Sequence, residues 1–116
     1  MPVLADITKV HFAHFQFDLI VDAVSLSQLS GPDIALVISK AKDWLVPGGR
    51  MFSKLAAEPF DRRLVIAPLT LVNGLFVGKA FDGFSYVAQL ITGHAYGNIE
   101  SSYWLVHAKK DGESYD

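Results

Sequence analysis

The sequence contains no cysteine among its 116 residues. This absence excludes disulfide bonds, thiolate nucleophiles and metal sites built on cysteine, and it favours a cytoplasmic location. Long basic runs are also missing, because no run of lysine or arginine exceeds two residues, and the formal net charge is −2. We therefore expect no nucleic-acid partner. The N-terminus lacks a basic region followed by an apolar core, so no signal peptide is expected.

An uninterrupted apolar segment of membrane-spanning length is missing as well. The most apolar window, residues 64–81, is broken by Asn73, Lys79 and two glycines, whereas a span needs about 20 apolar residues. We expect a buried helix or a partner-covered surface there, and no membrane span. His11 and His14 stand three residues apart, but no cysteine or third histidine lies at ligand spacing. A packing or surface role is favoured over a metal site.

What the sequence does contain is a high proportion of apolar residues. They make up 51% of the chain, against 19% charged residues, so the chain folds rather than remaining disordered. Its length fits one domain, residues 1–116. Within it we expect an N-terminal arm over residues 1–16, extended or a short strand, and a flexible tail over residues 111–116.

The clearest local pattern is a strand, a helix and a second strand. Residues 17–23 form a nearly continuous apolar run, as in a strand covered on both faces. Ser30 or Gly31 caps a helix over residues 32–45, whose apolar positions follow the i, i+3, i+4, i+7 rule. The Pro47-Gly48-Gly49 turn ends that helix, and residues 50–55 form the next strand. The pattern predicts a βαβ unit with parallel strands and a right-handed crossover.

Later segments give weaker patterns. Residues 64–75 fit either a strand or a helix, and residues 84–91 fit a helix with one apolar side. Residues 94–98 read as a turn-rich link or the start of a strand. Residues 102–109 form the last clear strand, because aromatic and β-branched residues dominate it.

These residues carry a family resemblance. The run Phe-Asp-Leu-Ile-Val at residues 17–21, the helix after it and Leu-Val-Pro-Gly-Gly-Arg-Met at residues 45–51 resemble the second half of class I S-adenosylmethionine-dependent methyltransferases. The closing run at residues 103–110 is similar to that family's last strand. The resemblance covers about residues 17–110. It implies an α/β, Rossmann-like methyltransferase fold, C-terminal half only, with parallel strands and an antiparallel last strand.

The resemblance also implies a site beyond the carboxyl end of the first strand, where open α/β sheets bind ligands. It places the methionine end of S-adenosylmethionine near Asp22 and Ala23. The substrate then lies near three polar residues, Ser25, Ser27 and Gln28. A general base is needed for methyl transfer to oxygen; Asp22 and His94 are the candidates, and His107 is weighed as a structural residue. The alternative is that Asp22 and the serines only solvate a loop.

One departure from the family limits these expectations. The family's glycine-rich turn and the acidic residue of its second strand would both precede Phe17, and no Gly-x-Gly stands there. A nucleoside cofactor needs both features. We therefore expect methyl transfer to an oxygen of a small-molecule acceptor only within a larger unit, with a homo-oligomer or a complementary chain. The alternative is a non-catalytic half-domain for protein–protein interaction or homo-oligomerisation.

Overall fold

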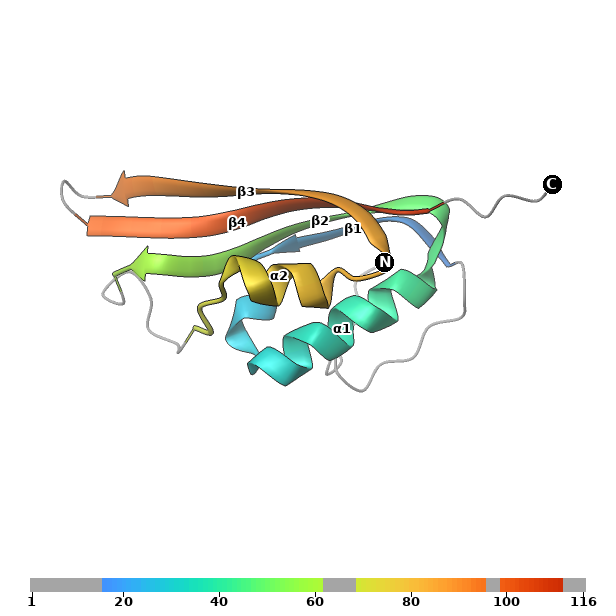
Figure 1. Ribbon diagram of the computed structural model, residues 1–116, viewed down its shortest axis with the longest axis horizontal. Helices are drawn as coiled ribbons and strands as arrows, with labels where there is room; N and C mark the ends of the chain where they lie inside the picture. The colour runs from blue at the N-terminus through green and yellow to red at the C-terminus, as the bar shows by residue number, and fades with distance from the viewer. Residues whose placement is uncertain (1–15, 62–68, 96–98, 112–116) are drawn as a thin grey trace.

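The structure is a computed structural model, and it describes residues 16–61, 69–95 and 99–111. The elements follow in the order β1, η1, α1, β2, α2, β3, β4 (Figure 1). The expected N-terminal arm up to residue 15, including His11 and His14, lies outside the described residues. So do most of the expected tail, from residue 112 onward, and most of the ambiguous segment, residues 62–68.

In the described residues, four strands form one sheet with the order β1-β2-β4-β3. The strands are β1 Phe17–Ala23, β2 Leu45–Phe60, β3 Phe84–Ala95 and β4 Ile99–Lys110. β1 pairs with β2 in parallel, and β4 pairs antiparallel with both β2 and β3. The predicted parallel pair and the antiparallel last strand are thus confirmed.

The connection between the parallel strands is helix α1, Gly31–Trp44, which confirms the predicted βαβ unit. Ser30 is the N-cap, and its hydroxyl oxygen accepts a hydrogen bond from the Asp33 backbone nitrogen at 3.3 Å. This bond satisfies one of the backbone donors that a helix start leaves open. β2 begins directly after the helix, and Gly48 turns the chain within it at a φ of 81°. That backbone region is open to glycine without steric cost.

The helix predicted over residues 84–91 is wrong, because these residues belong to β3. Apolar residues at positions 84, 87, 88 and 91 imitate a helical stripe, but the register of β3 on β4 overrides that local pattern. Aromatic and β-branched residues such as Tyr86, Val87 and Ile91 also favour extended backbone. The helix before β3 is α2, Gly74–Ala80, which lies within residues 64–81, where a buried helix was one of the two expectations. Its seven residues are too few to show a clear helical period.

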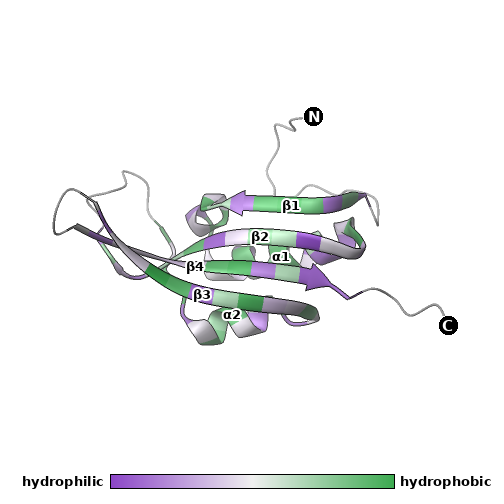
Figure 2. Ribbon diagram, turned by 90° about the horizontal axis from the view of Figure 1, so that it is seen from above, coloured by the Kyte–Doolittle hydropathy of each residue, from purple (hydrophilic) through white to green (hydrophobic). Residues whose placement is uncertain are grey.

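Both helices pack on the same face of the sheet (Figure 1). The core lies between that face and the helix layer, and its members include Ile34, Ile38, Leu45, Met51, Leu55, Val77, Phe81 and Val106. Among the residues that the structure describes, no helix covers the opposite face, which we call the open face (Figure 2). In the described ranges, no helix is long and apolar enough to cross a membrane.

Candidate functional site

The chain turns sharply where β1 ends. Val24 follows the strand with a φ of 75°, a left-handed conformation that β-branched residues rarely adopt. The short 3-10 helix η1, Ser25–Gln28, comes next. Strained backbone of this kind gathers at ligand sites, and this turn stands at the sheet edge where the family resemblance places the ligand. The turn is therefore the first candidate for a functional site.

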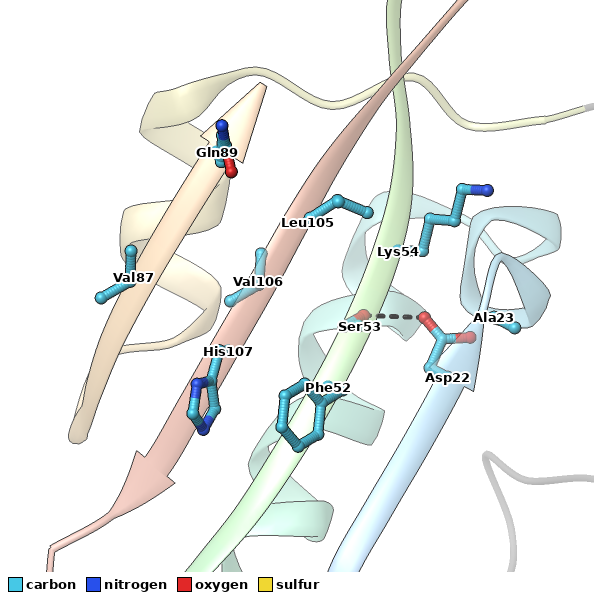
Figure 3. A pocket seen from close by; sticks show the side chains of 10 residues that line it. All are labelled: Asp22, Ala23, Phe52, Ser53, Lys54, Val87, Gln89, Leu105, Val106 and His107. Carbon is cyan, nitrogen blue, oxygen red and sulfur yellow. Dashed lines mark hydrogen bonds between the residues drawn. The ribbon is translucent and has the colours of Figure 1, made fainter. Parts of the chain in front are cut away.

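Asp22 holds this turn in place. Its carboxylate accepts a hydrogen bond from the Ser53 hydroxyl at 2.7 Å and another from the Leu26 backbone nitrogen at 3.0 Å. Burial raises the pKa of Asp22 above its ordinary value, and these hydrogen bonds offset part of that rise. The carboxylate thus joins the end of β1 to β2 and to η1. Figure 3 shows its bond to Ser53.

Ser27 has a structural contact in this arrangement. It is fully buried, and its hydroxyl oxygen accepts a hydrogen bond from the Ala56 backbone nitrogen at 2.9 Å. The backbone oxygen of Ser27 accepts a second bond from the Thr70 nitrogen at 2.7 Å. Ser27 therefore ties η1 to β2 and to the segment before α2. A substrate does not reach its hydroxyl in the described arrangement, contrary to the expected substrate contact.

Three of the expected site residues remain accessible at the end of β1. Ala23, Ser25 and Gln28 are all exposed, and they lie within six residues of one another. The structure therefore brings together every expected site residue except His94. Of the substrate-binding candidates, Ser25 and Gln28 present surface to a ligand.

His94 lies far from this turn. It stands near the end of β3, where it pairs with Glu100 of β4, and the two side chains approach to 3.9 Å. The position of β3 that aligns with Asp22 through the sheet is Ala88. Six residues of strand separate Ala88 from His94, which is roughly 20 Å at the usual rise per residue. Asp22 and His94 therefore do not form one catalytic pair.

A shallow groove on the open face was not predicted from the sequence. It has a volume of about 480 Å³. The rings of Phe52 and His107 stack across β2 and β4 with centroids 4.3 Å apart (Figure 3). Lys54 also lines the groove, and its ammonium nitrogen lies 4.2 Å from the centre of the Tyr103 ring. The alternation of side chains in residues 50–54 and 103–109 is the signal that would have placed these residues on one face.

His107 is part of this groove rather than a solvent-facing strand end. Its Nε2 atom is buried and has no hydrogen-bond partner in the described part of the chain. Within the same described residues, no group of three or more histidine, aspartate or glutamate side chains is arranged to hold a metal ion.

Comparison with solved structures identifies the fold. A methyltransferase dependent on S-adenosylmethionine (SAM) from Methanosarcina mazei superposes with a TM-score of 0.75 at 10% identity, over 94% of this chain and 66% of that one. The N-methyltransferase NodS from Bradyrhizobium japonicum, in complex with S-adenosyl-L-homocysteine, gives 0.66 at 19% identity, over 92% and 53%. The chain has the fold of the C-terminal half of a class I methyltransferase.

A third methyltransferase-fold structure agrees with this assignment. The 1,6-didemethyltoxoflavin-N1-methyltransferase from Burkholderia thailandensis gives a TM-score of 0.68 at 12% identity, over 94% of this chain and 50% of that one. The present chain thus spans between half and two-thirds of the length of these structures. No protein-family model matches the chain, and no curated protein sequence matches it.

The residues present do not fit a whole nucleoside cofactor. The family resemblance places the methionine end of the cofactor at the turn formed by Ala23 and η1. The sequence has no Gly-x-Gly motif at any position, and β1 forms an edge of the described sheet, with a strand on one side only. The glycine-rich turn and the ribose-binding carboxylate that a nucleoside cofactor needs are therefore not found in these 116 residues.

Proposed function

We propose that this chain forms the acceptor side of a SAM-dependent methyltransferase that acts on an oxygen of a small molecule. The observation that carries the proposal is the strand order β1-β2-β4-β3 with one parallel pair, in a chain that superposes along nearly its whole length on SAM-dependent methyltransferases. The proposal includes a second segment that supplies the glycine-rich turn, as a complementary chain or as part of a larger unit.

Each accessible residue of the turn has a role in this proposal. Ala23 lies toward the methionine end of the cofactor, and Ser25 and Gln28 lie toward the acceptor. Asp22 acts as a positioning residue, because both of its carboxylate oxygens already hold the turn together. The proposal assigns no catalytic role to His94, which lies at the far end of β3.

Cofactor titration of the chain tests the proposal. We expect weak, saturable binding of SAM or S-adenosylhomocysteine at millimolar concentration, with amide shift changes in the NMR spectrum gathered at Ala23 and η1. Ala23→Trp should abolish these changes by filling the space beside the turn. Leu75→Trp is the matched control, because Leu75 is 70% exposed on α2. Absence of both heat and shift changes at millimolar cofactor would exclude cofactor contact by this chain.

A second candidate function belongs to another class. We propose as the alternative a non-catalytic half-domain that binds a partner or forms a homo-oligomer. Exposed apolar side chains on the open face and an edge strand at β1 favour it, because such surfaces mark interaction sites. Light scattering after size exclusion separates the two outcomes: a monomer at all concentrations contradicts self-association.

A further inference from the structure

Strand β3 forms the outer edge of the described sheet on the side opposite β1 (Figure 2). It runs for twelve residues, Phe84–Ala95, and its register on β4 is continuous over that whole length. An edge strand presents a row of unpaired backbone N–H and C=O groups, to which another strand can bind. A long and regular edge of this kind is therefore a template for a further strand.

The residues that usually protect an edge strand are missing from β3. Residues 84–95 contain no lysine, arginine, aspartate, glutamate or proline. Each of the other three described strands carries at least two charged residues: Asp18 and Asp22 in β1, Arg50, Lys54 and Glu58 in β2, and Glu100, Lys109 and Lys110 in β4. Charged side chains, proline and bulges keep natural edges from pairing, so an edge without them indicates a strand that pairs.

Apolar side chains of β3 are exposed on both faces of the sheet. Val87 and Ile91 point to the open face and are 72% and 40% exposed. Leu90 points to the helix side and is 47% exposed. Side chains alternate between the faces along a strand, so a second strand beside β3 would cover apolar surface on both faces and also satisfy its backbone groups.

A second copy of β3 is the occupant that suits this edge. In a two-fold dimer the same strand pairs antiparallel with itself, so each residue must tolerate the residue that symmetry places opposite it. β3 meets this condition because it contains no acidic residue, lysine or arginine. The other edge does not: β1 centred on Ile20 would set Asp18 opposite Asp22 of the second copy, and like charges directly opposite destabilise a strand pair.

Helix α2 limits where two copies can meet. It begins at Gly74, where an added Cβ would lie 3.5 Å from the Trp104 ring, and Trp104 is the β4 partner of Leu90. β3 continues past this end of the helix (Figure 1). A two-fold axis at Ile91 therefore lets residues 87–95 pair while the two α2 helices lie on opposite sides of the axis.

We propose that β3 pairs antiparallel with β3 of a second copy about a two-fold axis at Ile91, which joins the two sheets into one. Ile91 then lies opposite Ile91 of the second copy, and Leu90 lies opposite Thr92. Backbone hydrogen bonds along residues 87–95 supply the main attraction. Burial of the exposed Ile91 and Leu90 side chains adds to it.

This pairing uses the backbone edge of β3 rather than the turn after β1. It is compatible with both functions proposed above and rests on neither. Cofactor titration tests methyl transfer separately, and the second candidate function names the open face and the β1 edge instead. Variants of β3 therefore fail or succeed independently of those proposals.

Opposed charges at the axis test the pairing by size exclusion with light scattering. The unmodified chain should form a dimer whose share rises with concentration. Ile91→Lys and Ile91→Glu should each raise the dimer dissociation constant at least about tenfold, because like charges then meet at the axis. An equimolar mixture of the two variants should restore the dimer, since an ammonium then faces a carboxylate. Leu75→Lys is the control, because Leu75 is 70% exposed on α2; it should leave the dissociation constant unchanged.

The absence of cysteine allows a direct test of the register. Ile91→Cys introduces a single thiol per chain, and opposite residues of an antiparallel pair have Cα atoms about 4.5–5.5 Å apart, within reach of a disulfide. Mild oxidation should therefore give a covalent dimer. Val87→Cys is the control, because eight residues of ladder, roughly 26 Å, separate the two copies of residue 87. It should cross-link at least about tenfold less.

Several outcomes oppose the proposal. A monomer at every concentration, or a dimer that Ile91→Lys and Ile91→Glu leave intact, would overturn it, and so would equal cross-linking of the two cysteine variants. A monomer whose β3 amide signals shift on addition of an alternating threonine–valine peptide would assign the edge to a strand of another polypeptide. A dimer that Val21→Asp dissociates and Ile91→Lys does not would place the contact on the open face.

Discussion

Asp22 accepts a hydrogen bond from the Ser53 hydroxyl at 2.7 Å and thereby joins the carboxyl end of β1 to the middle of β2. Its other carboxylate oxygen accepts a hydrogen bond from the Leu26 backbone nitrogen. One side chain at the end of β1 thus fixes both the neighbouring strand and the turn that follows. The sequence analysis predicted chemistry for Asp22, and the structure shows what the carboxylate holds in place.

Titration of Asp22 should make stability depend on pH. Burial raises its pKa above the ordinary 3.8, so the folded chain binds this proton more tightly than the unfolded chain. The free energy of unfolding should therefore fall as pH rises from about 3.8 through the raised pKa. Asp22→Asn should flatten that dependence, because the amide oxygen still accepts from Leu26 and its nitrogen donates to Ser53. Urea unfolding between pH 3.5 and 7 measures how the free energy of unfolding depends on pH.

Truncation of Asp22 to alanine should destabilise the folded chain. Asp22→Ala should lower the free energy of unfolding by about 1–3 kcal/mol at pH 7, because two buried donors lose their acceptor. If Asp22→Asn were as destabilising as Asp22→Ala at that pH, the carboxylate charge itself would be required.

Ser27 and Ser25 should differ sharply although they stand two residues apart. Ser27→Ala removes the acceptor for the buried Ala56 nitrogen, so the free energy of unfolding should fall by about 1–3 kcal/mol. Ser25→Ala is the control, because Ser25 is exposed and a change there should stay within about 0.5 kcal/mol. Chemical denaturation of both variants tests the difference; equal stability would refute the structural role of Ser27.

Replacing Val24 with a residue that tolerates a positive φ should relieve backbone strain. Its φ of 75° places a β-branched side chain in the left-handed region, where strain costs an L-residue about 1–2 kcal/mol. Val24→Asn should keep stability constant or raise it by a few tenths of a kcal/mol, since the gain offsets the loss of partly buried apolar surface. Thermal unfolding measures the change. A marked loss would mean that packing of the valine outweighs the strain.

Gly48 lies in the turn inside β2, and Gly93 in β3 is its matched control. A Cβ at either position would meet nothing within 4 Å, but only Gly48 has a positive φ, of 81°. Gly48→Ala should cost about 1–2 kcal/mol through backbone strain, whereas Gly93→Ala in β3 should be neutral or stabilising. Equal effects on thermal unfolding would contradict the backbone explanation.

The sequence predicted the parts of the fold that local chemistry specifies. The Ser30 cap and the apolar stripe of α1 lie close together along the chain, and so the βαβ unit was predicted correctly. The Pro47-Gly48-Gly49 turn was predicted to end the helix, but it lies inside β2, which already begins at Leu45. The half-methyltransferase fold was implied by the resemblance of residues 17–21, 45–51 and 103–110 to that family. The βαβ prediction succeeded because hydrogen bonding and burial in these segments depend on near neighbours in the sequence.

The tertiary structure alone decided β3, the buried state of Ser27 and the open face. Residues 84–91 match a helical period as well as a strand, and pairing with β4 selects the strand. From local sequence Ser27 is only a polar loop residue. Its structural role depends on the hydrogen bond that its hydroxyl oxygen accepts from the Ala56 backbone nitrogen, 29 positions away. The four strands bring distant residues of the open face into register as one row, Val21, Phe52, His107 and Val87. Local sequence determines which segments can become strands, whereas long-range pairing determines which side chains share a surface.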